Sequence, residues 1–302
     1  MAAGANSFKT ILYALIANAS IAVAKGVAAA ITGSSAMLAE AIHSVADSGN
    51  QLLLLWGMKQ ARTKPSEDHP LGFGKAVYFW SFVVAVVLFS VGGLFSIYEG
   101  MHKFQDPEPL NSPEWAIGVL LFAIVAEGFS LWGAMRQVKK VRFGRSLARW
   151  FAESRQSELL VVVGEDFAAL LGLVFALVAI GATMLTGNPV YDSIGTMFIG
   201  VLLIVVAYFI AVEVKALLIG QSVEPHVRVK MRSFLDNRDD VAEIYNLLTL
   251  QMGNDVMVAV KARMVATASA DLLIEAINTT EAAFRAEFPQ VMWLFFEPDN
   301  KD

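Results

Sequence analysis

Long apolar stretches alternate with short polar segments over the first two thirds of the chain. A helix that crosses a bilayer needs ~20 mostly apolar residues. The separating segments contain turn-forming residues such as Gly33, Pro65 and Pro189, which end helices. The pattern therefore predicts six transmembrane helices. They span Phe8–Thr32, Ala36–Arg62, Ala76–His102, Pro113–Gln137, Glu158–Met184 and Tyr191–Leu218.

The rest of the chain has shorter apolar periods, which are typical of a small α/β domain. A Gly253-Asn254-Asp255 turn separates two stretches of strand-like residues. The order helix-strand-strand-helix-strand suits a small sheet with its helices on one face, here a ferredoxin-like fold. We expect helices at Glu224–Asn237 and Ser269–Phe288, and strands at Val241–Gln251, Val256–Val265 and Val291–Glu297.

The balance of basic and acidic residues changes where the long apolar stretches end. Residues 1–219 carry 15 basic and 15 acidic side chains, whereas residues 220–302 carry 8 and 13. We therefore predict a transmembrane domain over residues 1–219 and a cytoplasmic domain over residues 220–302. The whole chain is 56% apolar and only 17% charged, so a membrane protein is expected.

Composition excludes several other classes of protein. The net charge of −5 gives no basic excess, so we expect no nucleic-acid partner. There is no cysteine, which excludes a disulfide framework, a thiolate zinc site and a cysteine nucleophile. The N-terminus lacks a short apolar core followed by a small-residue cleavage site, so we expect no cleaved signal peptide.

The distribution of basic residues predicts the orientation in the membrane. Basic residues lie at the start of the first span (Lys9), around the loop between spans two and three, between spans four and five, and at the end of span six (Lys215), while Lys103 alone falls on the opposite side. Because basic loops stay cytoplasmic, both termini are expected in the cytoplasm. A bacterial inner membrane is the expected location, with an organelle membrane as the alternative.

Ionisable residues inside spans are costly and usually functional. His43 and Asp47 share one face of the second span because they are four residues apart. The fifth span carries Glu165 and Asp166. An imidazole with carboxylates suits a divalent ion such as zinc. The alternative is a proton relay or an inter-helix pair without a metal.

Two further ionisable residues leave both interpretations open. Glu127 lies in the middle of span four, where it either handles protons, supplies a further ligand, or pairs with a polar neighbour. Lys25 lies in span one and is expected to pair or to extend toward the interface rather than to transport.

Three motifs resemble those of one transporter family. They are GSSAMLAEAIHSVAD, DHPLGFGKAVYFW and YDSIGTMFIGVLLI, beginning at Gly33, Asp68 and Tyr191. Together with the predicted layout they resemble the cation diffusion facilitator family of divalent-metal/proton antiporters, which work as homodimers. The fifth-span run EDFAALLG is similar to the branch that includes zinc transporters.

The resemblance implies a transported-metal site formed by His43, Asp47 and Asp166. The family's fourth ligand position falls on Val162, which cannot coordinate a metal. Glu165 or a water is expected to supply the missing ligand. Zinc is the first choice of cargo, with iron(II), manganese or cobalt as alternatives.

Two other metal sites of the family are incomplete here. The loop after span two keeps Asp68 and His69, but Phe73 replaces a second histidine. The tail has one histidine, His226, so we expect no metal cluster there and a tail that dimerises through apolar and polar contacts.

The sequence thus predicts proton-coupled efflux of a divalent metal, with protons as co-substrate, a homodimer in the lipid bilayer and no resident cofactor. The alternative is a non-transporting subunit that dimerises with an active relative, as Val162 suggests. An enzyme is not expected, because neither HExxH nor Gly-x-Ser-x-Gly occurs.

Overall fold

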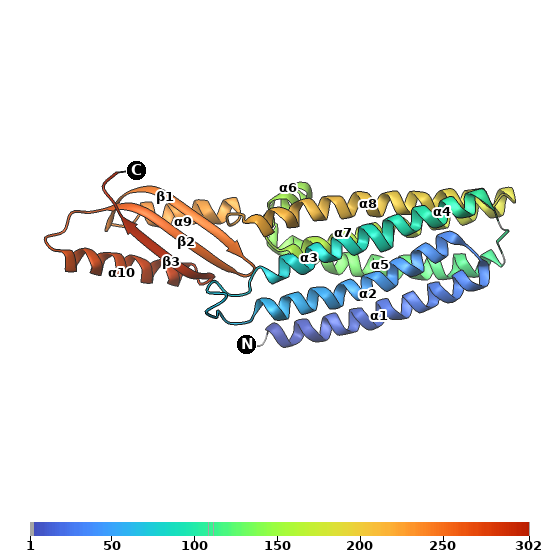
Figure 1. Ribbon diagram of the computed structural model, residues 1–302, viewed down its shortest axis with the longest axis horizontal. Coiled ribbons are helices and arrows are strands. Elements are labelled where there is room, and N and C mark those ends of the chain that lie inside the picture. The colour runs from blue at the N-terminus through green and yellow to red at the C-terminus, as the bar shows by residue number, and fades with distance from the viewer. Residues whose placement is uncertain (1–2, 108, 111, 302) are drawn as a thin grey trace. The chain divides into compact units, whose positions relative to one another are not determined.

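The computed structural model describes residues 3–107, 109–110 and 112–301, with the side chains of residues 3–14, 16 and 17 left out (Figure 1). The described chain divides into two compact units. The first contains residues 1–57, 79–147 and 157–214, and the second contains residues 58–78, 148–156 and 215–302. The predicted boundary between residues 219 and 220 stays a prediction.

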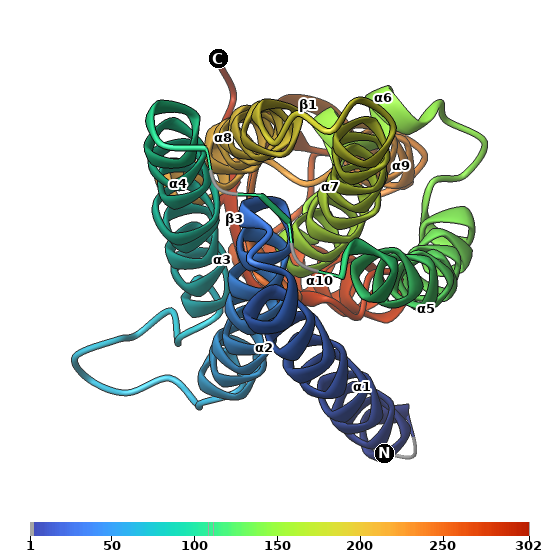
Figure 2. The ribbon, with the colours of Figure 1, turned by 90° about the vertical axis from the view of Figure 1, so that its right-hand side faces the viewer.

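Helices lie where all six predicted spans were expected. Their bounds are α1 Ala3–Thr32, α2 Ser35–Ala61, α3 to α4 Ala76–Gln105, α5 Pro113–Val141, α7 Ser157–Thr186 and α8 Val190–Ile219. Within the first unit, α5 packs against both α7 and α1 (Figure 2). The last four of these helices are long and apolar enough to cross a membrane, and the Asn18–Thr32 part of α1 is a shorter apolar stretch. Helix α2 is less apolar because it carries Glu40, His43 and Asp47.

The third span differs from the prediction of one continuous α-helix. It consists of α3 (Ala76–Val87), the π-helical segment η1 (Leu88–Leu94) and α4 (Phe95–Gln105). Ser90 Oγ donates to the Val86 carbonyl at 2.7 Å, and Ser96 Oγ donates to the Gly92 carbonyl at 2.7 Å. Side-chain hydrogen bonds of this kind compete with the regular helical pattern, and π segments concentrate near functional sites.

Glycines bring the third span against α8. A Cβ added to Gly93 would lie 2.5 Å from Ile204 Cγ1, and one added to Gly200 would lie 2.8 Å from the Gly93 carbonyl oxygen. Small residues at such positions let two backbones approach closely, which is a main source of helix association in membranes.

Asp192 ties the start of α8 to the start of α2. Its carboxylate accepts hydrogen bonds from Ser34 Oγ at 2.7 Å and from the Ser35 backbone N at 2.8 Å. Gly33 makes the turn before them with φ of 67°, a region that glycine adopts without strain. Asp192 therefore caps the neighbouring helix α2 as well as opening its own helix.

In the second unit the predicted order α-β-β-α-β is confirmed. The elements are α9 Pro225–Asp236, β1 Val241–Met252, β2 Asp255–Met264, α10 Ala270–Glu287 and β3 Val291–Pro298. The strands form one sheet in the order β1-β2-β3, with β1 antiparallel and β3 parallel to β2. Met231 of α9, Val258 of β2 and Phe284 of α10 share one core, so both helices cover the same face. Ser269 caps α10, since its Oγ accepts a hydrogen bond from Leu272 N at 3.3 Å.

The loop that carries the GFGK sequence packs against the β1–β2 turn within the second unit. Gly253 N donates to Tyr78 Oη at 3.0 Å. A Cβ added to Gly74 would lie 2.1 Å from the Met252 carbonyl oxygen. Because that oxygen belongs to the backbone of a paired strand, any side chain at residue 74 forces the loop away.

We therefore expect Gly74→Ala to lower the thermal unfolding midpoint of the detergent-solubilised protein. Overpacking of this kind typically costs ~1–3 kcal/mol. Gly128→Ala is the matched control, because nothing lies within 4 Å of a Cβ at that position. Equal midpoints for the two variants would contradict the close approach of Gly74 to β1.

Candidate metal site between helices two and seven

The polar face of α2 is built as the sequence predicts. His43 and Asp47 are both buried, and His43 Nε2 lies 3.4 Å from Asp47 Oδ2. Both ring nitrogens of His43 and Asp47 Oδ1 are buried without a hydrogen-bond partner in the structure. Buried polar atoms are normally hydrogen-bonded. Imidazole nitrogens and a carboxylate oxygen that lack such partners, one helical turn apart, are therefore suited to binding a cation.

The two acids of α7 are buried but face different neighbours. Glu165 Oε1 accepts a hydrogen bond from Asn50 Nδ2 of α2 at 2.6 Å. Asp166 Oδ2 accepts one from Ser130 Oγ of α5 at 2.9 Å. Successive helical residues differ by ~100° in direction, and for this reason one carboxylate reaches α2 while the other reaches α5.

Asp47 is the common neighbour of these acids. Its carboxylate interacts electrostatically with those of Glu165, Glu127 and Asp166. Among the described residues, however, no group of three or more histidine or acidic side chains lies close enough to hold a metal ion. His43, Asp47, Glu165 and Asp166 therefore gather in one region without forming a closed ligand shell, and their role as ligands stays a prediction.

Asn50 and Ser130 are the residues that hold the two α7 acids in place. Neither Asn50 nor Ser130 is ionisable, so neither is among the candidate site residues predicted from the sequence. A signal existed for Ser130, which lies three residues after Glu127 and so shares its helix face. Each carboxylate has a second oxygen, so each acid could coordinate a metal while it keeps its hydrogen bond.

Lys25 pairs inside the bundle rather than extending to the interface. Its ammonium group is fully buried and donates to Glu40 Oε2 at 3.2 Å and to Ser44 Oγ at 2.7 Å. Glu40 precedes His43 by one helical turn on α2. Gly172 of α7 leaves room for this carboxylate, since a Cβ there would lie 2.4 Å from Glu40 Oε1.

We expect Gly172→Ala to displace the Glu40 carboxylate and to destabilise the protein by ~1 kcal/mol, the low end for overpacking, because a side-chain tip can move aside. Gly181→Ala on the same helix is the control, since nothing lies within 4 Å of a Cβ there. Thermal unfolding in detergent measures the difference. An unchanged midpoint for Gly172→Ala would show that Glu40 does not fill this space.

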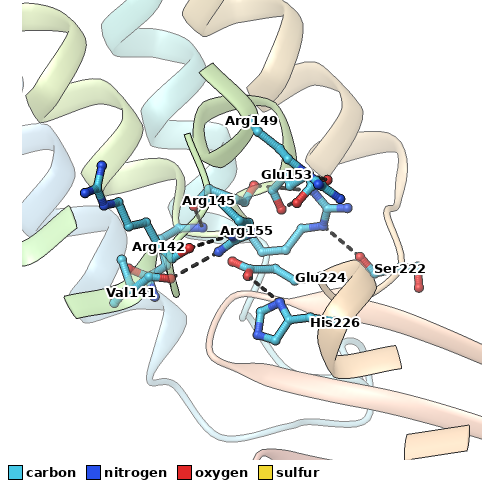
Figure 3. Close-up of polar contacts among 11 residues, drawn as sticks. Val141, Arg142, Arg145, Arg149, Glu153, Arg155, Ser222, Glu224 and His226 are labelled. Carbon is cyan, nitrogen blue, oxygen red and sulfur yellow. Dashed lines mark hydrogen bonds and ion pairs between the residues drawn. The ribbon is translucent and has the colours of Figure 1, made fainter. Parts of the chain in front are cut away.

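The loop residues Asp68 and His69 lie on an exposed segment. The His69 ring stacks on Phe73 with centroids 4.3 Å apart, so the aromatic residue at the second histidine position occupies the imidazole face. In the tail, His226 Nδ1 lies 3.3 Å from Glu224 Oε2 (Figure 3). The described part of the chain shows no metal-ligand cluster at either place.

Basic residues between α5 and α7 make local contacts. Arg145 covers the carboxyl end of α5, donating from Nε to the Arg142 carbonyl at 2.9 Å and from Nη2 to the Val141 carbonyl at 3.1 Å (Figure 3). In the second unit, Arg155 Nε donates to the Ser222 carbonyl at 2.7 Å. A cation at a helix carboxyl end is favourable because it meets the negative end of the helix dipole.

Comparison with known proteins identifies the family. The cation efflux transmembrane domain matches residues 11–219. The human mitochondrial proton-coupled zinc antiporter SLC30A9 is 33% identical to this chain, over 81% of this chain and 44% of its own length. The Xenopus laevis protein of that name is 36% identical, over 74% of this chain and 40% of its own length. The zinc transporter ZitB of Pectobacterium atrosepticum is 26% identical over 89% of this chain and 80% of its own.

The chain thus spans less than half the length of the SLC30A9 relatives. The domain match covers more than half of the chain. It includes the buried ionisable residues of the helices, which we call the polar cluster: Lys25, Glu40, His43, Asp47, Glu127, Glu165, Asp166 and Asp192. The sequence motifs, the six long helices and the αββαβ tail agree with that match. The chain belongs to the cation efflux family, also called the cation diffusion facilitator family.

Proposed function

We propose that this protein moves a divalent metal cation across a membrane in exchange for protons, with zinc as its first cargo. Relatives named as a proton-coupled zinc antiporter and as a zinc transporter support the proposal. The single observation that carries it is the buried His43–Asp47 pair on α2, whose donor atoms lack hydrogen-bond partners and which lies in the electrostatic field of the α7 acids.

Charge balance favours a divalent cargo. Lys25 is the one buried lysine or arginine among the described residues of the bundle, whereas the buried acids there are more numerous. These acids are Glu40, Asp47, Glu127, Glu165, Asp166 and Asp192. Unbalanced buried charge is costly, so either protons or a doubly charged ion must neutralise the acids. Exchange between these two states is the essence of metal/proton antiport.

In the proposed cycle a cytoplasmic ion reaches His43 and Asp47 and draws in the carboxylates of Glu165 and Asp166. Ligand atoms must be deprotonated to bind a metal, so metal binding releases protons. Movement of the helices then exposes the ion to the opposite side.

Several finer features belong to the same proposal. Both termini and residues 220–302 face the cytoplasm, the protein works as a homodimer in the lipid bilayer, and the membrane is a bacterial inner membrane. Residues 1–219 transport and residues 220–302 dimerise. The chain catalyses no covalent reaction and carries no resident cofactor.

The deciding experiment is metal flux in vesicles that contain only this purified chain. We expect zinc to accumulate inside the vesicles when their interior is more acidic than the outside solution. Zinc uptake should stop when this pH gradient is collapsed. Iron(II), manganese and cobalt in the same assay give the selectivity order. A non-transporting subunit, which the valine at residue 162 favours, would give no flux alone and would gain it only with an active relative.

A further inference from the structure

Asn50 is a third α2 residue whose buried side chain has an atom without a partner. The Asn50 side chain is fully buried, and its Oδ1 has no hydrogen-bond partner among the described residues. Asp47 Oδ1 and both ring nitrogens of His43 are in the same state. Spacings of four and three residues place His43, Asp47 and Asn50 along one stripe of the helix. Buried polar atoms are normally hydrogen-bonded, so a stripe of three such side chains is suited to a ligand rather than to packing.

Glu165 of α7 holds the other end of the Asn50 amide. Asn50 Nδ2 donates a hydrogen bond to Glu165 Oε1 at 2.6 Å. A carboxylate oxygen accepts hydrogen bonds, so it engages the NH₂ group of the amide and leaves the carbonyl oxygen uncommitted. Glu165 also interacts electrostatically with Asp47, so Asn50 and Asp47 meet the same carboxylate. A side chain that is already fixed in this way loses little freedom when it binds an ion.

We propose that Asn50 Oδ1 is a ligand of the transported ion, with Glu165 as the residue that orients the amide. This inference rests on the proposed transport of a metal by His43 and Asp47. Helical side chains lean toward the N-terminus of their helix, so Asn50 leans toward Asp47. Helix α2 then supplies an imidazole nitrogen, a carboxylate oxygen and an amide oxygen. One carboxylate of α7 completes the four ligands that zinc prefers, although residue 162 is a valine.

The chemistry of an amide oxygen gives Asn50 a role in selectivity. The amide is neutral, so it adds a ligand atom without adding to the excess of buried acids in the bundle. Carbonyl and carboxylate oxygens suit manganese, whereas imidazole nitrogen suits zinc. Asn50 should therefore lower the preference of the site for zinc over manganese, in opposition to His43.

The test compares zinc and manganese(II) affinities, each measured by titration of the purified full-length protein. Asn50→Leu removes the oxygen at nearly constant size, and Asn50→His replaces it with a nitrogen ligand. We expect Asn50→Leu to weaken manganese binding at least ~10-fold and zinc binding less, because even residues that only support a ligand are worth ~10–100-fold in affinity. Asn50→His should raise the ratio of zinc to manganese affinity at least ~10-fold.

Gln51→Leu is the matched control on the same helix. Gln51 also carries an amide oxygen without a hydrogen-bond partner in the described structure, but it points ~100° away from the stripe. Its replacement should leave both affinities at the wild-type values. Thermal unfolding midpoints establish which variants are folded. Both Asn50 variants are read through the same affinity ratio, so either one suffices for the test.

A wild-type ratio of zinc to manganese affinity in a folded Asn50 variant overturns this inference. That result includes the case in which both affinities fall by the same factor, since Asn50 would then act only by holding Glu165. The proposed function would still stand, because the protein binds zinc through His43 and Asp47. A wild type that binds zinc but no manganese would also contradict the amide ligand. A wild type that binds neither metal overturns the proposed function as well.

Discussion

Asp47→Asn should reduce zinc flux in proteoliposomes by at least ~100-fold while leaving the fold intact. The carboxylate of Asp47 lies 3.4 Å from His43 Nε2 and interacts with acids of α5 and α7. An amide has almost the same shape, but it carries no charge and is a poor ligand for zinc, which takes imidazole and carboxylate groups. Removing one buried negative charge from a cluster of acids also relieves repulsion, so no loss of stability is expected.

The measurement is initial zinc uptake under a fixed pH gradient, with protein content matched between vesicle preparations. Asp106→Asn is the control, because Asp106 is an exposed aspartate outside the polar cluster. It should transport at the wild-type rate. Flux near the wild-type value for Asp47→Asn would remove Asp47 from the site and would shift attention to the α7 acids.

The helices could be predicted from the sequence because each needs only its own apolar residues. A bilayer imposes the same length on every span, and the turn residues at Gly33 and Gly187 mark the ends of α1 and α7 to within a residue or two. The interruption at Leu88–Leu94 could not be predicted from hydropathy. It depends on serine hydroxyls that bond to their own helix and on glycines that pack against α8.

The candidate site was predictable by residue type but not by partner. The spacing of His43 and Asp47 fixes their shared face, because four residues make about one helical turn. Which way Glu165 and Asp166 point depends on the rotation of α7 against α2 and α5, and a sequence pattern does not contain that angle. For the same reason the hydrogen bond from Ser130 to Asp166 became visible only in the structure.

In the second unit, too, the strands could be predicted from the sequence, but their arrangement in the sheet could not. Strand-like residues on both sides of the turn predicted β1 and β2, and their antiparallel pairing follows from the short turn at Gly253. The parallel pairing of β3 with β2 requires the crossover through α10, and that connection is long enough for either edge of the sheet. The choice of edge comes from the core shared by α9, α10 and the strands.

Glu165→Gln should weaken zinc binding on the order of 100-fold if Glu165 takes over the ligand position that falls on Val162. Glutamine keeps an oxygen that can accept the hydrogen bond from Asn50, now 2.6 Å from Glu165 Oε1, so packing between α2 and α7 should survive. What is lost is the negative charge and the strong oxygen donor. Titration of the purified variant with zinc measures the change in affinity.

A second substitution makes the test specific to the ligand position. Val162→His places an imidazole one turn before Glu165 and Asp166, where the resemblance to the family puts a ligand. The double variant Val162→His/Glu165→Gln should therefore regain most of the lost affinity, since histidine is a good zinc ligand. Val163→His/Glu165→Gln is the matched control, because residue 163 points ~100° away on the same helix. Equal recovery by both double variants, or by neither, would mean that Glu165 does not replace a ligand at residue 162 and that a water or Asp166 alone completes the α7 side of the site.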